Sequence, residues 1–114
     1  MVKQQAVLDG VFGALSDPVR RHIVERLARG ERTAGDIAAS FSISQPAVSR
    51  HIKVLERSGL LTRTIVGREH HLRITPRALV TASRWLERQR AFWESSFDRL
   101  DQLLEHTSEK DSTP

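Results

Sequence analysis

The chain has 114 residues, which is enough for one compact domain and too few for two ordinary ones. It contains no cysteine, which excludes disulfides, thiolate metal ligands and a cysteine nucleophile. The N-terminal segment lacks the pattern of a secretory signal, and no stretch approaches the roughly 20 apolar residues that span a bilayer. We therefore expect a cytosolic protein with no membrane partner.

The formal net charge is +4, and it is unevenly distributed along the chain. Residues 17–75 hold 11 Lys and Arg against 6 Asp and Glu, a net of +5. Residues 76–114 hold 6 against 7, and residues 1–16 balance at zero. A basic middle segment favours a polyanionic partner. A basic face that is only solvated would have the same charge, so charge alone does not establish such a partner.

Three helices are predicted before residue 44. Apolar residues at helical spacing favour the first over residues 4–15. Asp17 as N-cap and Pro18 at the first helical position start the second, which Gly30 ends. Thr33 caps a third, shorter helix that ends near Phe41.

A fourth helix is predicted from its cap Ser44 to Ser58. Two short helices joined by a few residues, of which the second carries the charge, form a helix-turn-helix. On a helical wheel one side of the fourth helix is aliphatic and anchors it to the domain. The aliphatic residues are Val48, Ile52 and Leu55.

The opposite side of this helix is polar and cationic. A helix in the major groove needs short polar groups at its N-terminal end, close to the bases, and long cations further along, near phosphates. Gln45 suits a bidentate contact to adenine, and Arg50 suits one to guanine. An ordinary amphipathic helix has a similar wet face, but the capped helix before it and the hairpin after it favour DNA binding. The expected contacts are Ser44, Gln45, Pro46, Ser49, Arg50, Lys53 and Arg57.

Residues 61–75 predict two strands joined by a turn at 66–69, which together form a wing. Arg68 at the turn and Arg63 on the first strand are further expected DNA contacts. The arginines of the second helix are equally suited to intramolecular ion pairs and to phosphate contacts. They are Arg20, Arg21, Arg26 and Arg29.

A last helix is predicted from Pro76 to about His106. Residues along one side of this helix recur at alternating spacings of four and three, which makes a heptad seam, and further aromatic residues widen it. One small core does not cover so broad an apolar surface. A dimer interface is the economical interpretation, and a ligand pocket lined by Trp85, Phe92 and Trp93 is the alternative. The seam consists of Ala82, Leu86, Gln89, Trp93, Ser96, Leu100 and Leu103, with Phe97 beside it.

Three segments, LSDPVRRHIVERL, TAGDIAASFSISQPAVSRHIKVLERSGLL and GREHHLRIT, resemble the ArsR/SmtB family of bacterial winged-helix repressors. The resemblance is firm over residues 8–75 and looser over the last helix. It implies a homodimer that binds a near-palindromic operator and represses transcription until a signal lowers its affinity. It places base contacts on Gln45, Pro46, Ser49 and Arg50. It also implies dimerisation through the first and last helices, where the expected interface is Val7, Val11, Leu86, Trp93, Phe97, Leu100 and Leu103.

The chain departs from the metal-sensing members of this family. Residues 33–39 read TAGDIAA, without a thiol, and the last helix has no histidine before His106. His70 and His71 are neighbours on a strand and point to opposite faces, while His22 and His51 suit packing or hydrogen bonding. We therefore expect no metal and no cofactor, and the sequence identifies no small-molecule inducer.

The predicted fold class is mainly α with a small β-hairpin: a winged helix-turn-helix with a long C-terminal dimerisation helix. Residues 1–106 form a single domain, in which 1–16 and 76–106 are dimerisation helices and 17–75 are the DNA-binding core and wing. Residues 107–114 form a disordered tail.

The predicted function is that of a sequence-specific double-stranded DNA-binding regulator, a homodimeric repressor associated with the nucleoid. The alternatives are a metal- or small-molecule-responsive derepressor of the same fold and a protein-interaction module without DNA binding. An enzyme is disfavoured, because the sequence has no paired acids, nucleophile motif or phosphate-cradling glycine loop.

Overall fold

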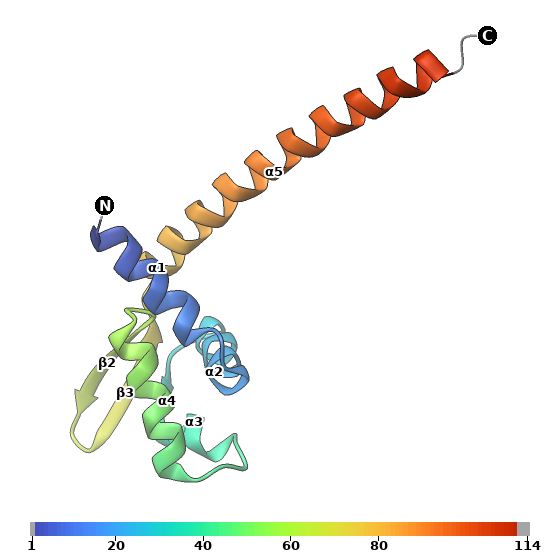
Figure 1. Cartoon of the computed structure of the whole chain (residues 1–114). Helices are drawn as coiled ribbons and strands as arrows, with labels where there is room; N and C mark the ends of the chain where they lie inside the picture. Colours follow the sequence, from blue (N-terminus) through green and yellow to red (C-terminus); the bar gives the residue numbers. More distant parts are fainter. Residues whose placement is uncertain (1, 112–114) are drawn as a thin grey trace. The chain divides into compact units, whose positions relative to one another are not determined.

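The computed structural model describes residues 2–111 and confirms the predicted fold class (Figure 1). The chain divides after Ala82 into two units. The first holds every strand, the first four helices and the start of the fifth, and the second holds the rest of the fifth helix. The elements are α1 Val2–Ala14, α2 Pro18–Ala28, β1 Arg32–Thr33, α3 Ala34–Ala39, α4 Gln45–Arg57, β2 Leu61–Val66, β3 Glu69–Ile74 and α5 Pro76–Asp111.

Short polar side chains begin three of the helices, as predicted. The carboxylate of Asp17 accepts hydrogen bonds from the amides of Val19 at 2.8 Å and Arg20 at 3.2 Å. The hydroxyls of Thr33 and Ser44 each accept one amide hydrogen bond at the starts of α3 and α4. These bonds satisfy amides that have no partner inside the helix, so each helix begins at a residue that the sequence specifies.

The strands form an antiparallel sheet in the order β1-β3-β2. The wing is the β2–β3 hairpin, in which Val66 pairs with Glu69 around a two-residue turn. Gly67 has φ 63°, a left-handed conformation that glycine adopts without a steric penalty. The sequence analysis did not predict β1, because a strand of two residues has no periodicity and is defined by its partner β3, where Arg32 pairs with Leu72.

The core of the first unit surrounds α4. Val48, Ile52 and Leu55 are at most 2% exposed, as their spacing predicted. They belong to one cluster with buried residues of α1, α2, α3 and the sheet, and α4 packs against α1, α2, α3 and β2. The aliphatic side of α4 therefore holds this helix in place in the first unit.

Two helix boundaries differ from the prediction. α3 ends at Ala39 and leaves Phe41 outside the helix. α5 continues to Asp111, so residues 107–111 are helical where a disordered tail was expected, and residues 112–114 lie outside the described part. The helix continues because no glycine or proline interrupts the sequence between Pro76 and Pro114.

The second unit carries large apolar side chains along one helix. Leu86, Phe92, Trp93, Phe97, Leu100, Leu103 and Leu104 are 51–63% exposed. On its polar side Arg90 pairs with Glu87 at 2.6 Å and with Glu94. The hydrogen bond and the charge of Arg90 lower the pKa of Glu87, and the two carboxylates raise the pKa of Arg90. No helix in residues 2–111 is long and apolar enough to cross a membrane.

Leu55→Ala tests whether the core holds α4. Leu55 is fully buried, so truncation should lower the free energy of unfolding by about 2–5 kcal/mol, measured by urea denaturation. Ile65→Ala is the control, because Ile65 is 61% exposed and its truncation should change stability by less than about 0.5 kcal/mol. Equal effects of the two substitutions would contradict the assignment of Leu55 to the core.

Candidate nucleic-acid interface

The predicted DNA-contacting residues of α4 lie together on its exposed side. Ser44, Gln45, Pro46, Ser49, Arg50, Lys53 and Arg57 are all exposed. The helix has a buried side and a polar side, and only the polar side is available to a ligand. The small side chains of Pro46 and Ser49 leave the N-terminal backbone of α4 open to close approach.

Four of the predicted contact cations are free of intramolecular partners. Among the residues that the structure describes, the side chains of Arg50, Lys53, Arg57 and Arg68 make no hydrogen bond or ion pair. Three of them share the outer arc of α4, at spacings of three and four residues, and Arg68 is in the wing turn. Their charge is therefore not neutralised by any described carboxylate and is available to an anion.

Arg63 differs from these four. Its guanidinium donates two hydrogen bonds of 3.2 Å to the carboxylate of Glu56 on α4 and one of 3.0 Å to Nδ1 of His70 on β3. Its side chain is only 20% exposed. Arg63 thus ties the wing to α4, an arrangement that the sequence analysis missed because Glu56 is seven residues away on another element.

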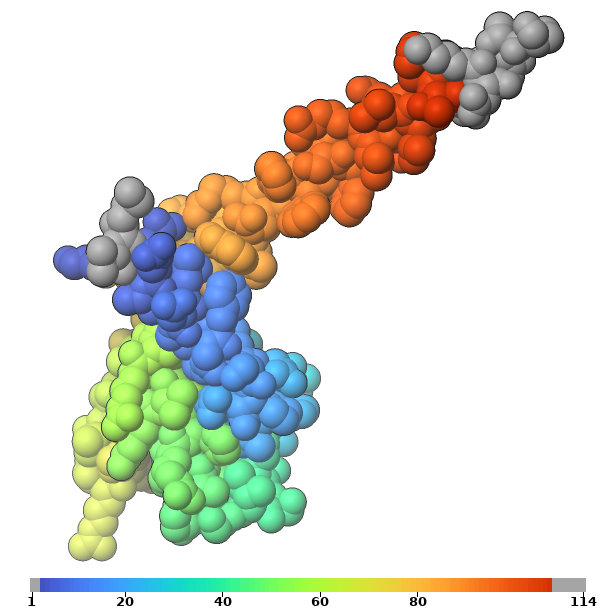
Figure 2. Space-filling view, in the orientation of Figure 1, coloured from blue at the N-terminus to red at the C-terminus, as the bar shows by residue number. Residues whose placement is uncertain are grey.

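The outer half of the wing has no covering element. Thr64, Ile65, Val66 and Arg68 are exposed, and in Figure 2 the hairpin tip extends beyond the rest of the first unit. Two β-branched apolar side chains, each 61% exposed, therefore stand next to the turn arginine. Such a tip suits insertion into a groove better than packing inside this unit.

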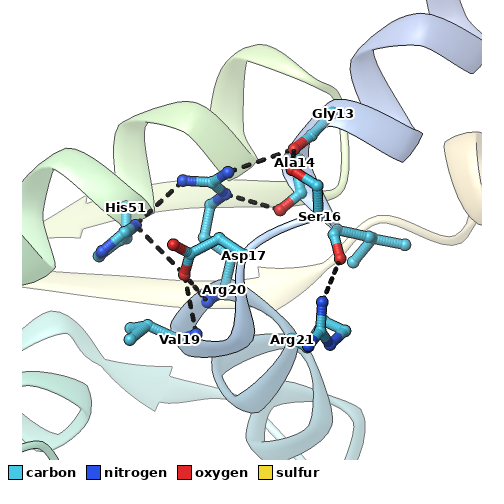
Figure 3. A network of polar contacts seen from close by, with 9 residues as sticks. Gly13, Ala14, Ser16, Asp17, Val19, Arg20, Arg21 and His51 are labelled. Carbon is cyan, nitrogen blue, oxygen red and sulfur yellow. Dashed lines mark hydrogen bonds and ion pairs between the residues drawn. The ribbon is translucent and has the colours of Figure 1, made fainter.

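Two arginines of the second helix bind carbonyl groups at the end of α1 (Figure 3). Arg20 donates to the carbonyls of Ala14 at 2.6 Å and Gly13 at 3.2 Å, and Arg21 donates to that of Leu15 at 2.9 Å. Their hydrogen bonds are intramolecular, but they go to backbone carbonyls and are not the ion pairs that the sequence analysis offered as one of two roles. Arg26 and Arg29 have no described side-chain partner.

His51 confirms the expectation of a hydrogen-bonding residue. Its Nδ1 lies 3.1 Å from Nη1 of Arg20 and 3.9 Å from Oδ1 of Asp17. Burial raises the pKa of the Asp17 carboxyl, but the amides of Arg20 and Val19 and the nearby charges of His51 and Arg20 outweigh it and lower that pKa below its ordinary 3.8. Asp17 is therefore a carboxylate across the neutral range.

The two histidines of the wing have different partners, carboxylates for His71 and an arginine for His70. His71 lies 3.1 Å from Glu69 and 3.9 Å from Glu31, whereas His70 faces Arg63. Within residues 2–111 no group of three or more His, Asp or Glu side chains is placed to hold a metal ion.

Comparison with known proteins identifies the family. A family model described as a helix-turn-helix domain matches residues 15–64. The HTH-type transcriptional regulator Rv2034 of Mycobacterium tuberculosis is 36% identical over 92% of this chain and 94% of its own length. The ArsR-like transcriptional regulator from Rhodococcus sp. RHA1 has a solved structure with 33% identity and a TM-score of 0.74, over 87% of this chain and 93% of that one.

The chain belongs to the ArsR family of winged helix-turn-helix transcriptional regulators. The transcriptional repressor SdpR of Bacillus subtilis is a further relative, 34% identical over 69% of this chain and 88% of its own length. The helix-turn-helix match includes α2, α3, α4 and part of β2. The exposed, cationic side of α4 thus lies within the residues that match the helix-turn-helix model.

Asp17→Asn tests the charge at the start of α2. Asparagine keeps the capping hydrogen bonds but not the charge. Because the folded pKa of Asp17 is lowered, its charge stabilises the protein above about pH 4 and this contribution is lost as the pH falls through the folded pKa.

Urea midpoints of both proteins at about pH 7 and about pH 3 measure this effect. The wild type should be the more stable at the higher pH, and its advantage should shrink at the lower one. An advantage that does not change with pH would show that the charge contributes nothing.

Proposed function

We propose that this ArsR regulator is a homodimeric repressor that binds a near-palindromic operator through α4 and the wing. The observation that carries the proposal is the division of α4 into a fully buried aliphatic side and an exposed side with three partnerless cations. A protein-interaction module would not need free cations in this order. The relative SdpR is named a transcriptional repressor, which supports the direction of regulation.

In this proposal the N-terminal end of α4 lies deepest in the major groove, and the residues further along the helix lie near phosphates. Gln45, Pro46 and Ser49 approach the base edges at the N-terminal end, and Ser44 caps the helix next to them. Arg50 makes a bidentate contact to guanine. Lys53 and Arg57 bind phosphates further along and fix the register of the helix on the duplex.

The wing adds a second contact. Arg68 and the exposed tip reach the backbone or the minor groove beside the site that α4 reads. We assign Arg63 a different role from the one expected at first, because its guanidinium is already bound to Glu56 and His70. It holds the wing against α4, so that Arg68 keeps a fixed distance from the recognition helix.

The dimer interface in this proposal is the apolar side of α5. Trp93 forms aromatic contacts with Phe92 and Phe97, with ring centroids 5.8 and 6.0 Å apart, and all three rings are more than half exposed. A second copy of the helix would cover them and Leu86, Leu100 and Leu103. Val7 is half-buried and remains in the proposed set. Val11 is fully buried in the core of its own unit, so it does not contact a partner.

The proposed activity is DNA binding, without catalysis or metal chemistry. A dimer places two α4 helices in successive major grooves, with half-sites about 34–36 Å apart. Occupation of a promoter by such a dimer excludes polymerase without a further domain. The proposed mechanism has no metal-dependent derepression, because the described residues do not form a metal site.

Arg50→Ala and Lys53→Ala test the proposed roles of the two side chains. Mobility-shift assays on the DNA upstream of the protein's own gene, at several salt concentrations, measure both. Arg50→Ala should cost about 1–3 kcal/mol of binding and relax the preference for that sequence over unrelated DNA. Lys53→Ala should weaken binding to both DNAs alike and reduce the slope of log affinity against log salt by about one unit.

Arg88→Ala is the matched control, because it removes one exposed charge from α5 and none from α4. It should leave the sequence preference unchanged. Wild-type affinity in both Arg50→Ala and Lys53→Ala would contradict the assignment of α4 as the DNA-reading helix.

Trp93→Asp tests the proposed dimer. A charge in the middle of the apolar side should convert the dimer to a monomer in light scattering coupled to gel filtration and weaken operator binding. Ser95→Asp introduces the same charge on the opposite side of the same helix and should remain dimeric. A dimeric Trp93→Asp protein would place the interface elsewhere.

A further inference from the structure

The side chain of Arg20 joins three helices of the first unit (Figure 3). It belongs to the first turn of α2, two of its nitrogen atoms donate to carbonyls at the end of α1, and Nη1 points to His51 of α4. The last carbonyls of a helix have no partner within it, and a cation there is favoured by the helix dipole. Arg20 therefore caps α1 and has one donor group left for the recognition helix.

The bond to His51 fixes the protonation of its ring. A guanidinium only donates hydrogen bonds, so Nδ1 of His51 must be the acceptor and must carry no proton. Asp17, the cap of the same helix α2, lies 3.9 Å from that nitrogen. Arg20 and Asp17, both from α2, are the charged groups recorded at this ring within the described chain.

His51 is well placed to orient α4. It follows Arg50 directly and stands on the flank between the buried side of the helix and the exposed one, with its side chain 21% exposed. Apolar packing of the buried side determines which side of α4 faces outward, but because it is non-directional it fixes the rotation of the helix less sharply than a hydrogen bond does. A hydrogen bond from a guanidinium that is itself held by two carbonyls is directional.

We propose that Arg20 and His51 are positioning residues that fix the rotation of α4 relative to the end of α1 and thereby set the affinity for DNA. The inference rests on the proposed function, in which α4 reads DNA. Recognition tolerates about 0.5 Å of displacement, so a small rotation of α4 moves Arg50 away from its base. We call Arg20, His51 and Asp17 the Arg20 clip.

Arg20→Ala and Arg21→Ala form a matched pair. Each removes one charge from α2 and one side chain bound to a carbonyl at the end of α1, but within the described residues Arg21 makes no hydrogen bond or ion pair to α4. At about pH 8, Arg20→Ala should bind operator DNA about tenfold more weakly than Arg21→Ala in a fluorescence anisotropy titration. Circular dichroism and light scattering check that both variants are folded and dimeric.

His51→Ala and His51→Asn separate positioning from simple stability. The amide oxygen of asparagine lies on the same atom position as Nδ1 and accepts a hydrogen bond, but it does not titrate. His51→Asn should keep near wild-type affinity at about pH 8, whereas His51→Ala should lose about tenfold. Near wild-type affinity in His51→Asn beside a loss in His51→Ala would show that the acceptor atom, and not the imidazole ring as such, positions α4.

Equal affinities of Arg20→Ala and Arg21→Ala, or of His51→Ala and His51→Asn, would overturn the proposal. If Arg20→Ala does not fold, the His51 pair decides alone. The proposed function is tested separately: loss of binding in Arg50→Ala with no effect in the clip variants would keep the function and remove the clip.

Discussion

Burial of three aliphatic side chains on one side of α4 is the constraint on which the interface depends. Val48, Ile52 and Leu55 meet buried residues from α1, α2, α3 and the sheet in a single core. Once they are buried, the helical repeat leaves Ser49, Arg50 and Lys53 no position except the exposed side. The core therefore determines which side chains form the exposed surface that we propose to read DNA.

The second organising feature is the division of the arginines into bound and free groups. Arg20, Arg21 and Arg63 are bound to carbonyl oxygens, a carboxylate or a histidine, and hold α1, α2, α4 and the wing together. Arg50, Arg57 and Arg68 have no such partner in the described chain. Net charge alone does not make this distinction, because every arginine counts the same in it.

Local signals in the sequence were enough to predict most of the fold. The caps Asp17, Thr33 and Ser44 lie within three residues of the amides they bind, so their effect is visible in the sequence itself. The spacing of Val48, Ile52 and Leu55 likewise reports a single helix. The wing was predictable because Gly67 supplies the one conformation that its tight turn requires.

Features that depend on distant residues were not predictable. Strand β1 exists because Arg32 pairs with Leu72, and Arg63 is hydrogen-bonded to Glu56 of another element. The bond between Arg20 and His51 spans 31 residues. Val11 was expected at the dimer interface because the resemblance implies dimerisation through the first helix, but neither a resemblance nor helical spacing distinguishes a side chain buried in its own core from one that contacts a partner.

The most direct test of the central claim is an NMR titration of the ¹⁵N-labelled protein with DNA from upstream of its own gene. The account predicts that the largest amide shifts fall on residues 44–53 and on the wing turn 67–68, while the amides of Ile52 and Leu55 keep their slow hydrogen exchange. Large shifts confined to α2 or α5, with the amides of Ser49 and Arg50 unchanged, would contradict it.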